Sequence, residues 1–355
     1  MKKLTRREFL KLAALGTGGL LLEQVLAACG IKATPATTTT PEPVNTSSPS
    51  PETVTTLSPT NITSTGAAPT AATSAVPDLV VVRGGEPEPM VRQALAALGG
   101  IQAFVPSGAK VILKPNICVS YRTYEFAATT NPWVVGALVK LCLEAGAASV
   151  KVMDYPFSGS ARDAYNTCGI QEQVEAAGGQ MEIMSNLKYV STPIPRGVSL
   201  KSASAYKDAL DADVLINVPI AKQHSNTGLS LGLKNLMGLV PDHDRDTMHS
   251  TSIHQGIADL ASLFQPVVKL TLMDAVRILT DGGPQGGDLA AVKKLDTIIA
   301  GVDMVAVDSY ATGLFGKTPE GVPYFTVPYI TKAAALGLGR SDLTNLNIQE
   351  LAANG

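Results

Sequence analysis

The chain has 355 residues, of which 45% are hydrophobic and only 5% aromatic, and its formal net charge is −2. This length fits one large α/β domain or two small ones. The charge gives no electrostatic case for nucleic acid, because proteins that bind nucleic acid present a basic surface. We therefore expect no nucleic-acid partner.

The N-terminal segment carries two export signals in register. Residues 5–11, TRREFLK, look like a twin-arginine motif, and the apolar segment Leu12–Leu22 after them is too short for a comfortable transmembrane helix. Residues 26–29, LAAC, are similar to a bacterial lipoprotein box, in which the cysteine is lipidated and becomes the new N-terminus. We expect a signal peptide over residues 1–28, with the twin-arginine translocase and the lipoprotein-processing enzymes as partners.

Acylation at Cys29 predicts the location of the mature protein. Several acyl chains on one cysteine give stable anchoring, so the protein should sit at the outer side of the cytoplasmic membrane or in the cell envelope. Residues 29–77 are dominated by Thr, Pro, Ser and Ala and show no hydrophobic periodicity. Such a segment buries too little apolar surface to offset its ordering entropy, so we expect a disordered tether that leads to a folded domain over residues 78–355.

From residue 78 onward, apolar runs alternate with amphipathic stretches, as in βαβ units. The apolar runs predict strands over Leu79–Arg83, Lys110–Lys114, Val150–Asp154, Val214–Val218, Val267–Asp274 and Thr297–Ala300. Helical periodicity predicts helices over Met90–Leu98, Pro132–Ala145, Ala161–Thr167, Gln171–Ala177, Ile253–Phe264, Met304–Phe315 and Pro328–Leu336. We expect an α/β fold, with a mainly parallel sheet and helices on both faces, in a single compact domain.

The rest of the chain is organised around residues 211–259. A buried strand, Val214–Val218, is followed by a glycine-punctuated loop that contains all four histidines of the protein. The polar residues in this stretch are Lys222, His224, Lys234, Asn235, Arg245 and His249, with glycines at 228, 232 and 238. Ligands of open α/β sheets bind beyond the carboxyl ends of the strands. The alternative is a solvated loop whose histidines are neighbours in sequence only.

Polar residues also stand at the other predicted strand ends. Lys114 and Asn116 follow one strand, and Asp154 ends the next. Asn217 and Asp274 close two more. If these strands are parallel and adjacent, the side chains converge on one edge of the sheet. The alternative for each single residue is a role as turn former or helix cap.

Such a cluster can do three kinds of work. It can hold a phosphate or carboxylate through cationic side chains and glycine-freed backbone N–H groups, and the residues available are Lys114, Lys222, Lys234, Arg245, Gly228 and Gly232. It can ligate a transition metal through His224, His249 and Asp274, although no short His-x3-His or Cys-x2-Cys spacing is present. A histidine with a pKa near neutrality can also move a proton.

Three cysteines follow Cys29, so they cannot all pair within the chain. Cys142 lies on the apolar face of its predicted helix, which favours a buried thiol. A disulfide between Cys118 and Cys168 stays open.

Several motifs of the domain occur together in one known family. They are Lys114-Pro115-Asn116, Thr130-Asn131-Pro132, Asn217-Val218-Pro219 with Lys222 and His224, residues 232–238 (GLKNLMG), Arg245, His249, residues 300–303 (AGVD) and Val307-Asp308. With them the chain resembles, from about residue 78 to 338, the bacterial and archaeal domain-of-unknown-function family 362 (DUF362). Members often carry an iron–sulfur ferredoxin module, for which this chain lacks the clustered cysteines. The family name implies no established reaction.

A more distant resemblance implies a cofactor. The stretch from His224 to Lys234, followed fifteen residues later by His249, is similar to the core of the lactate racemase family, which uses a nickel-pincer nucleotide. By that resemblance Lys234 would tether the pincer, His249 would ligate nickel, and His224 would be the general base. Residues 130–132 would take the place of a phosphate-contacting turn. The second histidine base of that family is missing, and residues 154–159 offer Asp154 or Tyr155 instead.

We therefore expect an exported, lipid-anchored protein that binds a metal or metal-nucleotide cofactor and acts on a small anionic substrate by isomerase or redox chemistry. The expected catalytic residues are His224, Lys234 and Asp154. The expected cofactor-binding residues are Lys114, Asn116, Thr130, Asn131, Gly228, Gly232, Lys234 and Asn235, and the expected metal ligands are His249 and Asp274. One alternative is a metal-dependent hydrolase of a phosphoester-like bond, with Asp154, Asp274 and His249 as ligands and Lys114 on the anion. The other is a non-catalytic surface module that binds an anion or a metal.

Overall fold

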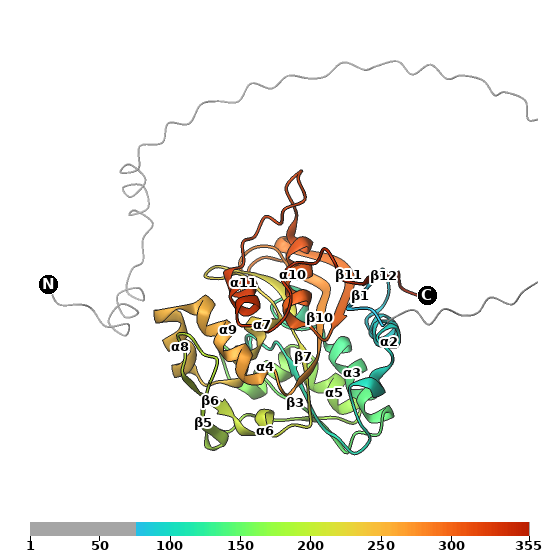
Figure 1. The fold of residues 1–355 in the computed structure, drawn as a ribbon. Coiled ribbons are helices and arrows are strands. Elements are labelled where there is room, and N and C mark those ends of the chain that lie inside the picture. Colours follow the sequence, from blue (N-terminus) through green and yellow to red (C-terminus); the bar gives the residue numbers. More distant parts are fainter. Residues whose placement is uncertain (1–75, 355) are drawn as a thin grey trace, which may run out of the picture. The chain divides into compact units, whose positions relative to one another are not determined.

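The computed structural model of the protein describes residues 76–354 (Figure 1). The expected signal peptide over residues 1–28, its lipidation site Cys29 and almost all of the expected tether over residues 29–77 lie outside the described residues. No helix within the described part combines the length and the apolar character that a membrane crossing requires.

A ten-stranded sheet forms the centre of the domain. Its strands are β1 (Leu79–Arg83), β2 (Lys110–Pro115), β3 (Ser149–Val152), β4 (Gln180–Met181), β7 (Val214–Val218), β8 (Ile220–His224), β9 (Gly228–Ser230), β10 (Val268–Leu279), β11 (Val292–Gly301) and β12 (Ile348–Ala352). The order is β12-β1-β11-β10-β7-β2-β3-β4, with β8 beside β10 and β9 beside β8. Only the pairs β1–β11, β10–β11 and β8–β9 are antiparallel, so the sheet is mainly parallel, as predicted. A separate antiparallel hairpin joins β5 (Tyr189–Pro193) and β6 (Ser202–Tyr206).

Helices cover both faces of the sheet, which confirms the predicted α/β architecture (Figure 1). One layer contains α2 (Pro87–Ala97), α3 (Pro132–Glu144), α4 (Ala161–Thr167) and α5 (Ile170–Ala176). The other contains α7 (Gly232–Asn235), α9 (Ile253–Phe264), α10 (Met304–Thr312) and α11 (Pro328–Ala335). Because side chains alternate along a strand, Val80 packs on the first layer and Val81 on the second. A short α6 (Lys207–Leu210) and a polar α8 (Asp242–Thr251) complete the α-helices of residues 76–354.

The strands β3, β2, β7 and β10 are neighbours and run parallel. Lys114 pairs with Asn217 across β2 and β7, and Asn217 pairs with Thr271 across β7 and β10. The carboxyl ends of β3, β2 and β7 therefore meet at one edge of the sheet, which is the arrangement that their strand-end residues require in order to converge. Strand β10 passes this edge and runs on to Leu279, so Asp274 lies within the strand and not at its end.

The largest departure from the predicted elements lies between residues 219 and 252. Lys222 and His224 lie on strand β8, which pairs with the unpredicted extension of β10, and not in a loop. Arg245 and His249 lie on helix α8. Strand β8 cannot be recognised from local periodicity, because pairing with distant strands holds it in place. Helix α8 shows no apolar stripe, because it is polar on nearly all sides. The acidic residues in the first turn of α8 favour its N-terminus.

Candidate functional site

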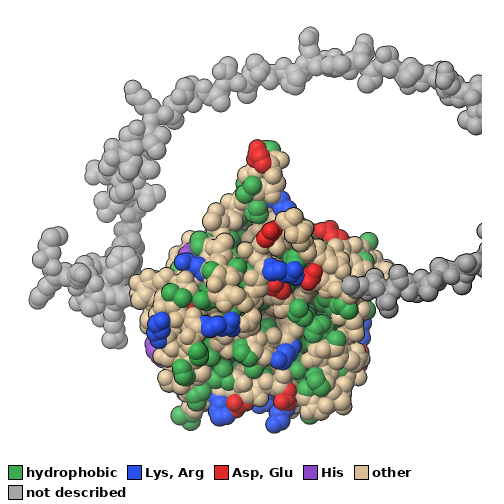
Figure 2. Space-filling model, viewed as in Figure 1, with side chains coloured by type: hydrophobic (Ala, Val, Ile, Leu, Met, Phe, Trp, Pro, Cys, Tyr) green, Lys and Arg blue, Asp and Glu red, His purple; other side chains and the backbone are tan. Residues whose placement is uncertain are grey.

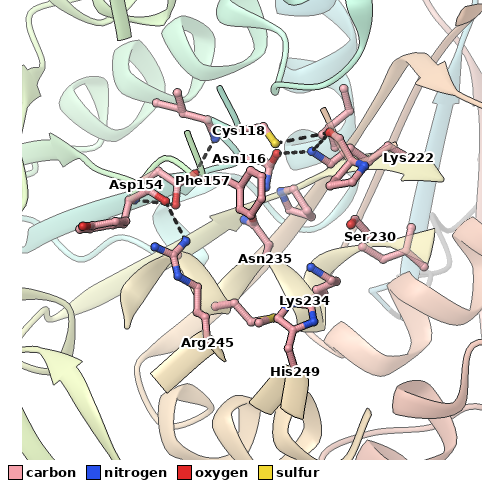
Figure 3. Close-up of a pocket in the computed structure, with 18 residues that line it drawn as sticks. Asn116, Cys118, Asp154, Phe157, Lys222, Ser230, Lys234, Asn235, Arg245 and His249 are labelled. Atoms are coloured by element: carbon pink, nitrogen blue, oxygen red, sulfur yellow. Dashed lines mark hydrogen bonds between the residues drawn. The ribbon is translucent and has the colours of Figure 1, made fainter. Parts of the chain in front are cut away.

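The carboxyl ends of the central strands surround a small pocket of about 90 Å³ (Figure 3). Residues from the strand ends, from α7 and from α8 contribute to its wall. The polar lining residues are Asn116, Cys118, Asp154, Lys222, Ser230, Lys234, Asn235, Arg245 and His249. The predicted residues that the fold brings together in this wall are Asn116, Asp154, Lys222, Lys234, Asn235, Arg245 and His249.

A buried ion pair forms the floor of this region. The Nζ atom of Lys114 lies 2.7 Å from Oδ1 of Asp154, and the side chains are 0% and 4% exposed. Burial lowers the pKa of Lys114, and the carboxylate of Asp154 works against that shift. The backbone N–H groups of Ile117 and Tyr155 also donate to Asp154. The pair therefore joins the chain after β2 to the chain after β3.

A glycine makes room for this ion pair. A Cβ atom on Gly238 would lie 1.8 Å from Oδ1 of Asp154 and 2.8 Å from Nζ of Lys114. Such distances are far below van der Waals contact, so a side chain at position 238 would displace the pair. The glycine at the end of the 232–238 motif is explained by this close approach.

Asn235 connects three elements of the site. Its Nδ2 donates to the carbonyl of Lys114 at 2.9 Å and to Oδ1 of Asn217 at 2.8 Å. Its Oδ1 accepts from Nζ of Lys114 at 3.1 Å and from Nδ2 of Asn116 at 3.2 Å. An asparagine amide offers two donors and two acceptor lone pairs, so this side chain is fully used within the protein. Asn235 thus positions β2, β7 and α7.

The start of α7 is fixed by a carboxylate from α10. Asp308 accepts from the backbone N–H groups of Gly232 at 2.7 Å and Leu233 at 2.9 Å. Burial raises the pKa of Asp308 to about 7. We expected the N–H of Gly232 to bind a ligand anion. It donates instead to the protein's own carboxylate, that of Asp308. Gly228 has φ +74° at the β8–β9 turn, a conformation that favours glycine, and it does not line the pocket.

The pocket contains more positive than negative charge. Lys222 is 1% exposed, and its Nζ donates only to neutral oxygens, those of Asn116, Ala128 and Pro284. Lys234 makes no hydrogen bond or ion pair with any residue in the described part of the chain. Burial lowers its pKa to about 7, and the nearby charge of Lys222 adds to this shift.

Arg245 adds to this charge from α8. Its guanidinium pairs with Asp242 at 2.6 Å, donates to the carbonyl of Tyr155 and keeps a buried Nε without a partner. The one carboxylate in the pocket wall is Asp154, and Lys114 already neutralises it. On the face of the domain that Figure 2 shows, basic and acidic side chains are instead interspersed.

Two of the four histidines come together. The rings of His224 and His249 are stacked with centroids 6.5 Å apart. Nδ1 of His224 accepts from the backbone N–H of Asn226, and burial, with Lys234 and Lys222 nearby, lowers the pKa of His224 to about 2. Burial also lowers the pKa of His249, which lines the pocket. Both rings are therefore neutral at pH 7.

Three of the expected site residues hold backbone instead of facing the pocket. Asp274 is fully buried and accepts from the N–H groups of Asn131 and Val276, and burial raises its pKa to about 7. Thr130 donates to the carbonyl of Val218, and Asn131 caps α3. These residues have the capping and turn roles that are the common alternative for strand-end polar residues.

The geometry also bears on the expected metal ligands. Asp154 and His249 line the pocket, but Asp274 does not. Asp274 therefore does not meet the other two expected metal ligands. Over residues 76–354, no group of three or more His, Cys, Asp or Glu side chains is arranged to hold a metal ion.

Several pocket residues, Pro284, Phe157 and Ser230 among them, were not singled out by their chemistry in the sequence. Pro284 belongs to the 282–287 loop, and its carbonyl accepts from Lys222 and from Sγ of Cys118. Phe157 is 58% exposed and stands at the pocket (Figure 3). No sequence signal marks a backbone carbonyl as an acceptor. Cys118, Cys142 and Cys168 are free thiols in the described part, so the disulfide left open in the sequence is not formed.

Two known proteins are similar to this chain. A thylakoid-associated protein of Synechocystis sp. is 28% identical over 239 residues, which are 66% of this chain and 71% of that protein. The solved lactate racemase apoprotein from Thermoanaerobacterium thermosaccharolyticum shares 14% identity with a TM-score of 0.39, over 63% of this chain and 54% of that chain. The chain spans about half the length of that racemase, and a likeness at this score supports no statement about function.

A family model matches the part of the chain that builds the pocket. The model described as a domain of unknown function (DUF362) covers residues 111–313, more than half of the chain. That range runs from β2, through α8, to α10. The chain belongs to the DUF362 family.

Proposed function

We propose that this chain binds a small organic anion in the pocket at the strand ends and acts on it as an enzyme. The observation that carries the proposal is the positive charge of Lys222 and Lys234, which no carboxylate compensates, around a cavity whose single carboxylate is already paired. Arg245 lines the same cavity and is paired with the exposed Asp242 outside it. In a site of low dielectric, such charges attract an anion more strongly than the same charges would in water.

The size of the pocket limits the ligand. A cavity of about 90 Å³ is well below the roughly 300 Å³ at which pockets for drug-sized ligands begin. It has room for a carboxylate or phosphate compound with only a few heavy atoms. We therefore place the substrate among small carboxylic acids and phosphate compounds.

Isomerase or redox chemistry remains our proposal for the reaction. Lys234 and His249 are the groups that could move a proton, because both line the pocket and both carry lowered pKa values. His224 is a poor choice as the general base, since an imidazole with a pKa of about 2 binds a proton very weakly.

A metal cofactor is supported by one observation, the stacked imidazoles of His224 and His249, whose neutral rings suit a transition metal. A bound metal would supply Lewis-acid or electron-transfer chemistry. The described residues offer no third ligand in this group, and the cavity is too small for a nucleotide. The site therefore does not fit the nickel-pincer nucleotide, and it does not fit the hydrolase centre of Asp154, Asp274 and His249 either. Metal analysis tests whether these histidines hold a metal. Stoichiometric metal in the wild type, and none in His249→Ala, would support a metal cofactor.

Lys234→Met tests anion binding, because this lysine leaves no partner unsatisfied when it is replaced. Protonated Lys234 attracts an anion, and the lysine loses its proton as pH rises through about 7. Calorimetric titration with acetate, whose charge is constant above pH 6, should therefore give an affinity that falls between pH 6 and 8. Phosphate gains charge over the same range, so its affinity for the variants is compared at pH 6 only. Lys234→Met should bind about tenfold more weakly at pH 6 and lose this pH dependence, a difference of about 1.4 kcal/mol.

The exposed residue Lys293 provides the matched control. Lys293→Met should bind both anions as the wild type does. An equal loss in both variants, or equal affinity for acetate and its neutral amide, would contradict the pocket as the anion site.

We also propose that the protein is exported and anchored through lipid on Cys29. The support is the register of the twin-arginine motif and the lipoprotein box in the sequence. Cys29→Ala should move the protein from the membrane fraction to the soluble exported fraction, and replacing Arg6 and Arg7 together by Lys should retain it inside the cell. Membrane association that survives Cys29→Ala unchanged would contradict lipid anchoring.

A further inference from the structure

We propose that Lys234 binds a carbonyl group covalently: its amine forms an imine with a small oxo acid, whose carboxylate is held by the surrounding cations. This inference rests on the proposed function, because it uses the same pocket and the same anion preference. It goes further by naming the substrate class and the atom that attacks it.

The hydrogen bonds of the three pocket-region lysines separate Lys234 from the others. Nζ of Lys114 is bonded to Asp154, to the carbonyl of Pro115 and to Asn235. Nζ of Lys222 is bonded to three neutral oxygens. An ammonium group has three N–H donors, so both of these lysines are saturated as cations. Lys234 alone among the three has no partner in the described part of the chain.

The position of Lys234 is fixed although its amine is free. Asp308 holds the two residues before it, and Asn235, directly after it, holds β2 and β7. The side chain lines the pocket opposite Cys118 and near His249 (Figure 3). A fixed backbone and an unbonded amine that faces a cavity are what a lysine nucleophile needs.

The charges around Lys234 favour its neutral form. Burial and the neighbouring cations, Lys222 first among them, lower its pKa to about 7, so about half of the amine is unprotonated at neutral pH. Only the neutral amine carries the lone pair that attacks a carbonyl carbon. The same cations that deprotonate Lys234 attract the carboxylate of the substrate.

The reaction balances without any co-reactant. The lone pair of Nζ forms a C–N bond to the carbonyl carbon, the C=O π electrons move to oxygen, and a proton passes from nitrogen to that oxygen. The C–O bond of the resulting carbinolamine then breaks and releases water, which leaves the imine. His249 is neutral and lines the pocket, so it can carry the proton between nitrogen and oxygen. The products are one imine and one water from one amine and one carbonyl.

Reductive trapping tests this inference on the purified full chain. Glyoxylate and cyanoborohydride at pH 7 should add one carboxymethyl group per chain, and peptide mapping should locate it on Lys234. The labelling rate should rise through pH 7 and level off above pH 8, whereas the exposed Lys293 should still gain rate toward pH 10. Labelling of Lys234 should exceed that of Lys293 at least tenfold with glyoxylate, and acetate should compete with it.

Two controls keep the result interpretable. Lys234→Arg keeps a cation but lacks the nucleophile, so it should bind acetate and form no adduct, with an unchanged melting temperature as the check on folding. Acetaldehyde has the carbonyl but no anionic group, so its preference for Lys234 over Lys293 should be at least tenfold smaller than that of glyoxylate, and acetate should not compete with it.

Each adverse outcome points to a different error. Acetate binding without an adduct on Lys234 would overturn this inference and leave the anion pocket standing. Absence of both would overturn the inference together with the proposed function. An equal preference for Lys234 with acetaldehyde and with glyoxylate would overturn the assignment of oxo acids as substrates.

Discussion

Lys114 and Lys234 illustrate how neighbours decide the role of a lysine. Lys114 is fully buried and paired with Asp154, so its charge stabilises the junction of two strand ends. Lys234, by contrast, has no partner in the described chain and faces the cavity. Removing one member of a buried pair leaves an uncompensated charge, which costs more than the pair itself contributes.

Replacing Lys114 tests the structural role of the ion pair. Lys114→Met should lower the free energy of unfolding by about 3–5 kcal/mol, because the carboxylate of Asp154 stays buried without its cation. Urea unfolding at pH 7 measures the change. Lys110→Met is the matched control at the exposed start of the same strand, and it should change stability by less than about 0.5 kcal/mol. Similar losses in the two variants would show that the ion pair is not what stabilises this edge.

At the scale of elements, the motif over residues 232–238 is a connector between three parts of the fold. Its first glycine meets Asp308 of α10, its asparagine bonds to β2 and β7, and its last glycine lies against the ion pair. α7 contains only four residues, so these contacts, and not helical propensity, hold it in place. The motif can therefore present Lys234 to the pocket from a fixed backbone.

A methyl group at position 238 tests this packing. The Cβ of Gly238→Ala would overlap Asp154, so the ion pair must shift, and we expect a loss of about 1–3 kcal/mol in unfolding free energy together with weaker acetate binding. Gly287→Ala is the control, because its Cβ would meet only ordinary contacts at 3.5 Å and beyond. Thermal unfolding and calorimetry measure the two effects. An unchanged Gly238→Ala variant would refute the close approach.

For the whole molecule, the buried carboxyl groups predict how stability depends on pH. Burial raises the pKa of Asp274 and of Asp308 from 3.8 to about 7. Between these values each of these two groups binds more protons in the folded chain than in the unfolded chain, so each makes the free energy of unfolding fall as pH rises. His224 and His249 act the other way below pH 6.5, because burial lowers their pKa values. Lys234 acts in a higher window, since its lowered pKa makes stability rise between pH 7 and 10.5.

Urea unfolding at several pH values checks this prediction. The stability of Asp274→Asn relative to the wild type should rise between pH 4 and 7, because the variant lacks one of the two contributions that fall with pH. The slope, and not the absolute stability, is the relevant quantity, since the substitution also weakens a hydrogen bond to Asn131 or Val276. Asp281→Asn, at an exposed position, should keep the slope of the wild type. Parallel slopes for Asp274→Asn and the wild type would contradict the raised pKa.

The sequence by itself determined the α/β class, the main strands and helices, the family and the edge of the sheet at which polar residues gather. These features follow from local periodicity and from motifs, which are written in neighbouring residues. Only the tertiary structure decided that Lys222 and His224 lie on a strand and that Asp274 and Asn131 hold backbone. It also decided that Lys234 is the lysine without a partner. The physical reason is that the hydrogen-bond and ion-pair partners of these residues come from segments far apart in the chain, such as Asp154 for Lys114 and Pro284 for Lys222. Charge compensation depends on distances in space, and no local pattern records them.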